Sequence, residues 1–518
     1  ITNGGRTRNL PGHDPAKWKL FVEYNRQDVV TEMEIESRLS RFPVPERVQR
    51  EWEYDMRISA RGVAADRELV DGALYCGTAI EEAAKQEAIT LTGLENPKSR
   101  EQMLTWLQGH GVAIPDLRSA TVEDALEHKD EFEPDVARVL ELRQLLSKAS
   151  IKKYSTVVTT MCEDGRIRGL LQFYGANRTG RWAGRLVQVQ NLPRTYLHGA
   201  MLDTARDLTR RKLPEGLKLL YGSVPGTLSQ LVRTALVPRP GCKFVDADFS
   251  AIEARVVAWL AGEEWVLQVF RTHGKIYEAT ASQMFGVPLD RIVKGNPEYA
   301  LRQKGKVATL ALGYQGGSSA LIAMGALKNG LTEEELPDIV SRWRQANRAI
   351  VRCWKAVEQA AIQAVETGRS CATHGLVFAR EADIDSGLDF LTIRLPSGRK
   401  LYYAQPHFGV NQWGGKQLRY YGMNQMTKKW SVIETYGGHM TENIVQAIAR
   451  DCLAVNIERL ENAGFPIVFH IHDEVVIEVP EDRADLDEVT RIMGQPIEWA
   501  PGLPLAADGW VGDYFTKD

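Results

Sequence analysis

The stretch "GFPIVFHIHDEVVIEVP", residues 464–480, places charged side chains in the middle of an apolar run. Its Ile, Val and Phe residues predict two buried strands, and His472, Asp473 and Glu474 fall where the turn between them must lie. Burying an ionised carboxylate without a partner costs several kcal/mol, so such a group pairs, turns to solvent or binds a metal. A partner for these carboxylates must therefore lie elsewhere in the chain.

The composition is that of a globular protein. With 518 residues, 44% of them hydrophobic and 25% charged, the chain should form two to four domains, and fibrous and disordered classes are excluded. The six cysteines include no C-x-x-C pair, which argues against a zinc knuckle or a disulfide framework and suits a reducing cytosol. The sequence has no apolar run that could span a bilayer and no signal-peptide pattern, so a cytoplasmic protein without membrane contact is expected.

Positive charge is concentrated in residues 141–194, although the whole chain has a net charge of −3. Ten Lys and Arg residues in this range face three acidic residues, and four aromatic residues are interleaved with them. Such a run is usually a solvated face, but cations among aromatics also suit a nucleic-acid track.

The chain alternates between helical and strand-like regions. Helices are expected over most of 46–160, after a proline-containing linker at 41–48, and again over 251–370. "LDFLTIRLPSGRKLYYA", residues 388–404, predicts a hairpin that turns at "PSGR". A further helix at about 440–463 precedes the opening stretch.

A second acidic motif lies in "FVDADFSAIEARV", residues 244–256, which reads as strand, turn and helix. Asp246 and Asp248 are two residues apart and so share one face of the strand, with Asp248 at its end. Ser250 and Glu253 form an S-x-x-E pattern, which predicts a capping box at the helix start.

A third motif lies in "NPEYALRQKGKVATLALGYQGG", residues 296–317, where Asn296 and Pro297 predict a helix start. The helix presents a stripe at four-residue steps, which consists of Arg302, Lys306, Leu310 and Tyr314. This stripe could be surface decoration. Alternatively, its two cations could grip a triphosphate while its other two residues stack on a base.

Together these segments resemble the motifs of a known family. "DFSAIE" (248–253), "RQKGKVATLALGY" (302–314) and "IHDEV" (471–475) resemble, in order, the A, B and C motifs of the family A DNA polymerases, here in a phage-type member. "TGRW" (179–182) and "QNLPR" (190–194) resemble the primer-template contact motifs of the family. The resemblance covers nearly the whole chain and implies an α+β fold, the right-hand polymerase fold, with an antiparallel sheet in the palm and helical fingers and thumb.

The resemblance also implies a division of the chain. In order, the expected parts are 1–42 as a C-terminal remnant of a 3′–5′ exonuclease domain, 43–75 leading into the palm, 76–160 as thumb, 161–255 as palm, 256–430 as fingers and 431–518 as the C-terminal part of the palm.

The implied function is template-directed DNA synthesis in replication or repair, in which deoxynucleotides join a primer 3′-end and pyrophosphate is released. Two Mg²⁺ ions, with Mn²⁺ as a substitute, are the implied cofactors. Asp248 and Asp473 are the expected carboxylate ligands, with the Phe249 carbonyl as a further one. The carboxylate of Glu474 is expected behind them.

The incoming nucleotide is expected to contact several of the quoted residues. Arg302 and Lys306 would bind its triphosphate, and Lys306 would also protonate the leaving pyrophosphate. Four further residues are expected around the nucleotide, namely Glu253, Leu310, Tyr314 and His472. Glu253 would exclude ribonucleotides, whereas at Leu310 the family commonly has Phe or Tyr.

Primer-template DNA and deoxynucleoside triphosphates are the implied partners, with a helicase or a single-strand-binding protein as further candidates and a monomer as the expected state. Arg181, Gln190 and Asn191 would contact the minor groove, whose acceptors look alike in every base pair. Lys152 and Lys153 would contact DNA from the basic run. The cytoplasm of a bacterial or phage-infected cell is the expected location.

"EYNRQD", residues 23–28, resembles the last exonuclease motif through Tyr24 and Asp28. The earlier D-x-E motif is missing from the sequence, so a remnant without excision of mismatched 3′-ends is expected. Ile1 in place of Met is what a fragment of a longer protein would show.

Three alternatives remain open at this point. A single-subunit RNA polymerase shares the hand-like fold, and Glu253 is the discriminating residue. A metal-dependent hydrolase could use His470 and His472 with Asp473 as an H-x-H-D site. A non-catalytic DNA-binding relic is the third, and a primer-extension assay with and without magnesium separates them.

Overall fold

The computed structural model describes every residue except 1–8, 41, 148–149, 384–386, 412–413 and 517–518. The chain divides into two compact units, Ile1–Asp55 and Met56–Asp518. No helix in the described part of the chain combines the length and apolarity that crossing a membrane requires.

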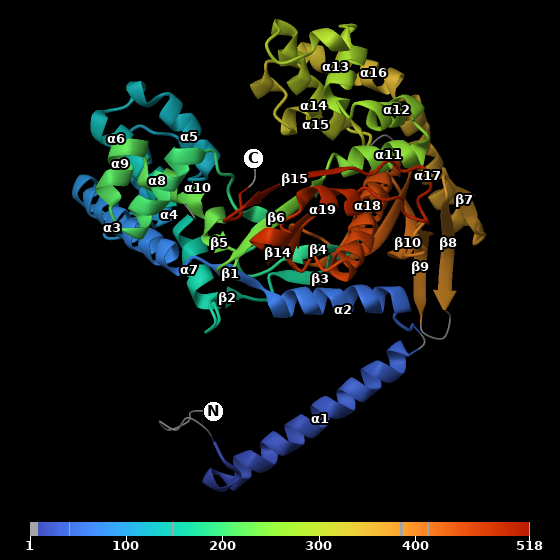
Figure 1. The fold of residues 1–518 in the computed structure, drawn as a ribbon, viewed down its shortest axis with the longest axis horizontal. Coiled ribbons are helices and arrows are strands. Elements are labelled where there is room, and N and C mark those ends of the chain that lie inside the picture. The colour runs from blue at the N-terminus through green and yellow to red at the C-terminus, as the bar shows by residue number, and fades with distance from the viewer. Residues whose placement is uncertain (1–8, 41, 148–149, 384–386, 412–413, 517–518) are drawn as a thin grey trace. The chain divides into compact units, whose positions relative to one another are not determined.

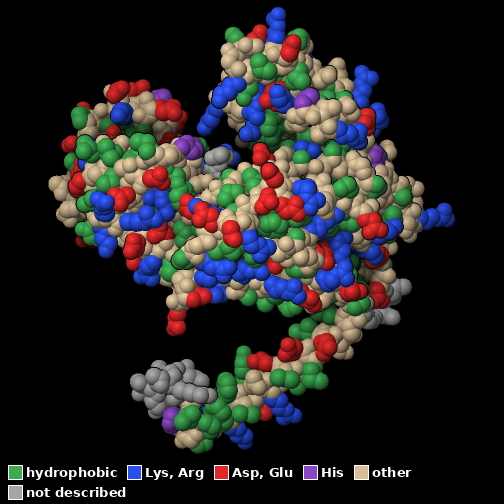
Figure 2. Space-filling view, in the orientation of Figure 1, with side chains coloured by type: hydrophobic (Ala, Val, Ile, Leu, Met, Phe, Trp, Pro, Cys, Tyr) green, Lys and Arg blue, Asp and Glu red, His purple; other side chains and the backbone are tan. Residues whose placement is uncertain are grey.

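Unit 1 contains α1 (Pro15–Leu39) and the first part of α2 (Glu46–Arg61). α1 buries no residue, and Figure 2 shows hydrophobic side chains exposed along it. Tyr24 and Asp28 lie on α1, and both side chains are exposed. The exonuclease resemblance of these two residues stays a prediction.

A four-stranded antiparallel sheet forms the centre of unit 2 (Figure 1). Its order is β13 (Ile467–Ile471), β14 (Glu474–Pro480), β6 (Cys242–Phe249) and β15 (Ala507–Gly512). The hairpin predicted from the opening stretch is confirmed, because β13 and β14 pair and leave only His472 and Asp473 between them. β6, the central strand of the predicted strand-turn-helix segment, is buried along most of its length.

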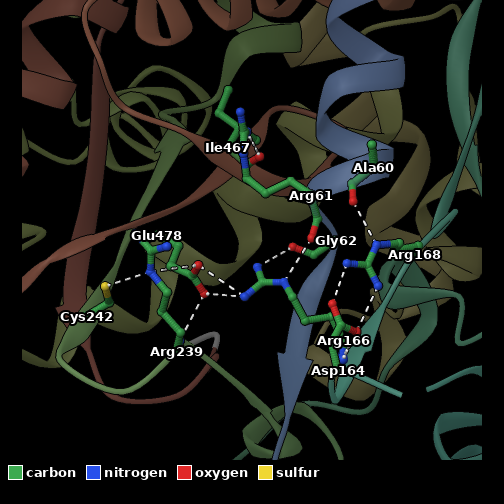
Figure 3. Close-up of polar contacts among 10 residues, drawn as sticks. All are labelled: Ala60, Arg61, Gly62, Asp164, Arg166, Arg168, Arg239, Cys242, Ile467 and Glu478. Carbon is green, nitrogen blue, oxygen red and sulfur yellow. Dashed lines mark hydrogen bonds and ion pairs between the residues drawn. The ribbon is translucent and has the colours of Figure 1, made fainter. Parts of the chain in front are cut away.

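An ion-pair network fixes the far end of β14 (Figure 3). Glu478 on β14 is buried, and its carboxylate pairs with Arg166 at 3.2 Å and accepts the Arg239 backbone N–H at 3.0 Å. Arg166 also donates to the backbone carbonyls of Arg61 and Gly62 at 2.8 and 2.6 Å. Buried charges that are paired and hydrogen-bonded in this way hold their strands in one register. β14 therefore presents its other end, beside Asp473, from a rigid position.

Unit 2 also contains two small sheets. The first has the order β2 (Arg166–Ile167), β1 (Val63–Ala65) and β5 (Leu236–Val237), and the second pairs β3 (Leu171–Ala176) with β4 (Arg181–Gly184).

One group of helices precedes β5 in the chain (Figure 1). It comprises α3 (Arg67–Thr92), α4 (Arg100–Gly109), α5 (Ser119–Glu127), α6 (Pro134–Ser147), α7 (Ser150–Thr160), α8 (Gly199–Arg210), α9 (Pro214–Tyr221) and α10 (Val224–Leu231). α8 and α10 pack on α3, so this helical body includes residues beyond the predicted 76–160.

A second group of helices follows β6. It comprises α11 (Ile252–Ala261), α12 (Glu264–Thr272), α13 (Ile276–Phe285), α14 (Leu301–Leu312), α15 (Ser318–Ala323), α16 (Leu336–Ala346) and α17 (Arg348–Thr367). The predicted dominance of helices over 251–370 is thus confirmed.

The remainder of unit 2 is a six-stranded antiparallel sheet followed by two helices. The strands are β12 (Trp430–Thr435), β11 (Lys416–Met423), β10 (Lys400–Val410), β9 (Leu388–Arg394), β8 (Leu376–Asp383) and β7 (Cys371–Thr373), in that spatial order. The predicted "PSGR" hairpin is confirmed as β9 and β10. α18 (Gly437–Asn462) is buried on nearly all sides and packs on α11 and α17, and α19 (Leu486–Met493) covers β6 and β15.

Candidate active site

The two aspartates expected to act together are brought to one edge of the central sheet. Asp248 is opposite Glu474 in the β6–β14 register, and Asp473 directly precedes Glu474. The Phe249 backbone N–H donates to the Asp473 carbonyl at 3.2 Å. Two segments 225 residues apart in the numbering therefore place their carboxylate-bearing residues side by side.

The turn that carries Asp473 is tightly constrained. His472 has a φ of 52°, in the left-handed region that a side chain normally avoids at a cost of about 1 kcal/mol. The Asp473 backbone N–H donates to the Ile471 carbonyl at 2.6 Å. Strain of this kind persists where the surroundings hold the backbone, so the flanking strands fix Asp473 at the tip.

The acidic residues of β6 and β14 share one face of the sheet. Asp246, Asp248 and Glu474 lie on it, because directly paired residues and residues two apart point the same way. The buried guanidinium of Arg233 lies near this face: desolvation lowers its pKa, and the charges of Glu474 and Asp246 oppose that shift. Arg233 donates in turn to the carbonyls of Leu192 and Pro193, both at 2.8 Å. A cation therefore compensates part of the buried negative charge.

His470 lies on the opposite face of this sheet. It pairs with Val475, one residue out of phase with Glu474, and its ring contacts Trp182 edge-on with centroids 4.7 Å apart. Burial lowers the pKa of His470 to about 3, and Arg450 adds to the shift. His470 is therefore a neutral packing residue facing away from Asp248, and the H-x-H-D metal site is not assembled.

The prediction that aromatic residues of the basic run contact nucleic acid is wrong for Tyr154 and Trp182, which are buried. Tyr154 is fully buried and donates its hydroxyl to the Leu228 carbonyl at 2.7 Å, and Trp182 is also buried. The buried Arg450 guanidinium of α18 lies over the Trp182 ring at 4.4 Å from the centroid. These rings pack inside the protein, so they are not available to stack on bases.

Of the residues expected to contact DNA, two are hydrogen-bonded to the protein backbone and two are exposed. Both ends of the Gln190 amide bind the backbone of β4, accepting from Gly184 N–H at 2.9 Å and donating to the Trp182 carbonyl at 3.2 Å. Lys153 donates to the Val187 carbonyl at 2.9 Å. Lys152 and Asn191 are exposed.

The expected capping box at Ser250 and Glu253 is wrong. α11 begins at Ile252, and the preceding residue, Ala251, has a φ of 52° and no side-chain cap. The Glu253 carboxylate instead accepts from the Arg181 guanidinium at 2.8 Å and from the Tyr314 hydroxyl at 2.8 Å. Glu253 therefore joins β4 to the end of α14.

The Tyr314 hydroxyl is held in its neutral form. Burial raises its pKa well above the ordinary value, and the neighbouring Glu253 carboxylate raises it further. Tyr314 therefore keeps its proton and donates a hydrogen bond to Glu253.

The predicted cationic stripe lies on α14 with one correction at its start. Residues Pro297–Ala300 form a 3₁₀ turn, and the Asn296 side chain donates to the Arg291 carbonyl at 3.1 Å in place of capping. α14 then carries Arg302, Lys306 and the exposed Leu310, while Tyr314 lies just beyond its last residue.

Tyr277 on α13 joins this cationic group and was missed by the sequence analysis. Its ring lies under both cations, with the Arg302 Cζ 5.4 Å and the Lys306 Nζ 5.8 Å from the ring centroid. Glu278 accepts from Arg302 Nε at 2.8 Å. Burial raises the pKa of Tyr277, the charge of Arg302 opposes the rise, and the charges of Glu278 and Asp473 add to it.

The donor set at this edge suits a hard divalent cation. Aspartate carboxylates and a backbone carbonyl are oxygen ligands, which Mg²⁺ prefers. Among the described residues, no group of three or more His, Cys, Asp and Glu side chains is placed to hold a metal ion. Mg²⁺ sites at phosphoryl-transfer centres use one or two carboxylates and take further ligands from substrate phosphates, so two aspartates are enough.

Comparison with known proteins gives a consistent assignment. The family model described as "DNA polymerase family A" matches residues 76–376. The DNA polymerase of Bacillus phage SP02 is 52% identical over 517 residues, which cover 100% of this chain and 78% of the relative. The thermostable DNA polymerase I of Thermus aquaticus is 26% identical over 293 residues, 55% of this chain and 28% of the relative.

A solved structure shares the fold. The polymerase domain of Pol1 from M. smegmatis, in complex with DNA primer-template and dNTP, aligns with a TM-score of 0.59 at 18% identity, covering 92% of this chain and 72% of that chain. The expected α+β polymerase fold is therefore confirmed. The chain belongs to DNA polymerase family A and is a DNA-directed DNA polymerase.

Proposed function

We propose that Asp248 and Asp473 hold two Mg²⁺ ions at the edge of the central sheet, where Mn²⁺ can replace them, and that Phe249 adds its carbonyl. The observation that carries this proposal is the hydrogen bond from Phe249 N–H to the Asp473 carbonyl, which sets both aspartates at one edge. Enzymes of this family depend on divalent metal ions, which stabilise charge on the transferring phosphoryl group.

The protein's own residues prepare the nucleotide for reaction. Arg302 and Lys306 project from one stripe of α14, so both can bind the triphosphate of the same deoxynucleotide. Lys306 can then donate a proton to the leaving pyrophosphate. His472 lies beside Asp473 in the turn and positions substrate at the primer end, and Glu474 supports the metal ligands from the paired strand.

Primer extension tests this proposal directly. A labelled primer-template with deoxynucleotides should be extended in Mg²⁺, should stop with a chelator and should resume with Mn²⁺. Extension that persists in chelator, or metal-dependent cleavage without extension, would contradict it. Ribonucleotide chains made without a primer would instead identify an RNA polymerase.

We also propose that Glu253 selects the sugar. Its carboxylate, held by Arg181 and Tyr314, fills the position that a 2′-hydroxyl would need. Glu253→Ala should raise ribonucleotide incorporation relative to deoxyribonucleotide by about tenfold or more, because one unwanted hydroxyl is then no longer excluded. Competition assays with paired ATP and dATP measure the ratio.

Tyr314→Phe is the matched control for Glu253, because it keeps the ring and removes only the hydroxyl that Glu253 accepts from. Its effect on the sugar ratio should be smaller. If Glu253→Ala lowers the melting temperature and leaves the ratio unchanged, the residue serves only to join β4 to α14.

The DNA contacts and domain roles follow as proposals. Arg181 and Asn191 contact the minor groove, and Gln190, with its amide engaged by β4, positions them. Lys152 and Lys153 contact the DNA backbone from α7. The thumb consists of 76–160 together with α8 and α10, which pack on α3, the palm of the rest of 161–255 with 431–518, and the fingers of 256–430. The enzyme acts as a cytoplasmic monomer on primer-template, with a helicase or single-strand-binding protein as replication partner.

A further inference from the structure

The six-stranded sheet has one well-covered face. α17 packs on β7, β8 and β9, and Asn443 of α18 donates to the Tyr403 hydroxyl at 3.2 Å. Six apolar or aromatic side chains on this inner face are at most 3% exposed, namely Phe378, Leu391, Ile393, Leu401, Tyr403 and Leu418. This face belongs to the core of unit 2.

The opposite face exposes aromatic and apolar side chains. Tyr402, which alternates with Leu401 and Tyr403, is 58% exposed, and Trp430 is 61% exposed. The Met423–Trp430 and Tyr421–Val432 pairs extend the same face across β11 and β12. The outer face of an antiparallel sheet is normally polar, so exposed aromatics in several strands indicate a binding surface.

The cations of this face are partly paired with carboxylates, and Arg419 of β11 pairs with Glu434 of β12 at 2.7 Å. Lys400 pairs with Glu381 at 2.6 Å, and the neighbouring Arg394, directly opposite Lys400, has no carboxylate partner among the described residues. Lys428 and Lys429, in the turn before Trp430, have none there either.

That turn is built to a fixed shape. The Asn424 carboxamide oxygen accepts from the backbone N–H groups of Met426 and Thr427 at 2.9 and 3.0 Å, and Lys428 has a φ of 55°. The two lysines are therefore held next to the exposed indole.

The edge strand β12 leads along the chain to the proposed nucleotide site. β12 ends at Thr435, two residues before α18, whose Gly438 N–H donates to the Gln315 side chain at 2.9 Å, next to Tyr314. Trp430, at the other end of β12, lies about 17 Å along the strand from Thr435.

We propose that this outer face binds the unpaired 5′ part of the template strand as it approaches the active site. Exposed rings give stacking surfaces for bases of any sequence, and cations beside them attract the backbone. The cations favour nucleic acid over a protein partner, because lysine is depleted at the centre of protein interfaces. A template is the single strand that every round of synthesis presents.

Binding without nucleotide tests the template face separately from catalysis. A primer-template with a dideoxy-terminated primer is prepared with a 5′ template tail of either 3 or 20 nucleotides, and affinity is measured by anisotropy at fixed salt. The wild type should bind the long tail at least about tenfold more tightly than the short one. Tyr402→Ser combined with Trp430→Ser should lose this gain and keep its short-tail affinity.

Two matched controls define the outcome. Tyr402→Phe with Trp430→Phe keeps the stacking rings and should keep the gain, and Leu219→Ser, at an 84% exposed site on α9, should change nothing. Arg394→Gln, Lys428→Gln and Lys429→Gln together should reduce the salt slope for the long tail by about 2. A wild type indifferent to tail length, or equal losses on both substrates, would overturn the proposal and leave the face to a protein partner.

Discussion

Asp473→Ala and Asp248→Ala should each lower the rate of primer extension by on the order of 10³-fold or more, the size of effect seen when one member of a cooperating catalytic set is removed. Each aspartate is expected to hold metal at the edge where the Phe249–Asp473 hydrogen bond joins the two segments. Single-turnover extension at saturating nucleotide measures the chemical step.

The same variants should bind primer-template almost normally, because phosphate contacts elsewhere supply most of the affinity. Asp508→Asn is the matched control. Asp508 lies on β15 opposite Asp248 in the strand register, is exposed, and accepts a hydrogen bond from the Gly509 N–H. Its rate should stay within about threefold of wild type, as for other surface changes. Near-normal turnover in Asp473→Ala or Asp248→Ala would remove that residue from the metal site.

The sequence predicts those parts of the site that depend on local pattern. Alternating apolar residues on both sides of His472 and Asp473 define a hairpin, and a strand of period two puts Asp246 and Asp248 on one face. The resemblance to the family motifs implies that Asp248 and Asp473 act together, and the pairing of β14 with β6 is seen only in the structure. What the pattern omits is the cation near the buried acids, because Arg233 comes from a separate 3₁₀ turn.

Local rules failed where distant residues compete for the same side chain. Ser250 and Glu253 have the spacing of a capping box, yet Glu253 gains two hydrogen bonds from Arg181 and Tyr314, which lie 72 and 61 residues away. A charge-assisted bond of this kind is stronger than a neutral helix cap.

Long-range packing also buries aromatic residues of the basic run that the sequence alone would leave exposed. Their spacing is compatible with a DNA track, but a guanidinium from α18 fills the space over Trp182. Tyr277 was missed for the related reason that its partners, Arg302 and Lys306, lie on another helix. Nothing in the local sequence of α13 marks it.

Lys306→Ala should slow nucleotide addition by about 10²-fold or more and raise the KM for the deoxynucleotide. Its ammonium is expected both to bind the triphosphate and to protonate the leaving pyrophosphate, and general acid catalysis contributes about 10²–10⁴-fold. Because the residue lies on α14 with Arg302, over the Tyr277 ring, affinity for primer-template should be unchanged. Pre-steady-state extension at varied nucleotide concentration separates the maximal rate of nucleotide addition from the affinity for the deoxynucleotide.

Two variants on the same helix separate the roles of Lys306. Lys306→Arg keeps the positive charge but cannot readily give up a proton, so it should hold KM near wild type and lower the rate. Lys304→Ala removes a lysine two residues earlier that lies near the Phe285 ring, and it should behave like wild type. If Lys306→Ala instead weakens DNA binding and leaves the nucleotide KM unchanged, Lys306 belongs to the template path, and the triphosphate must be held by Arg302 with other groups.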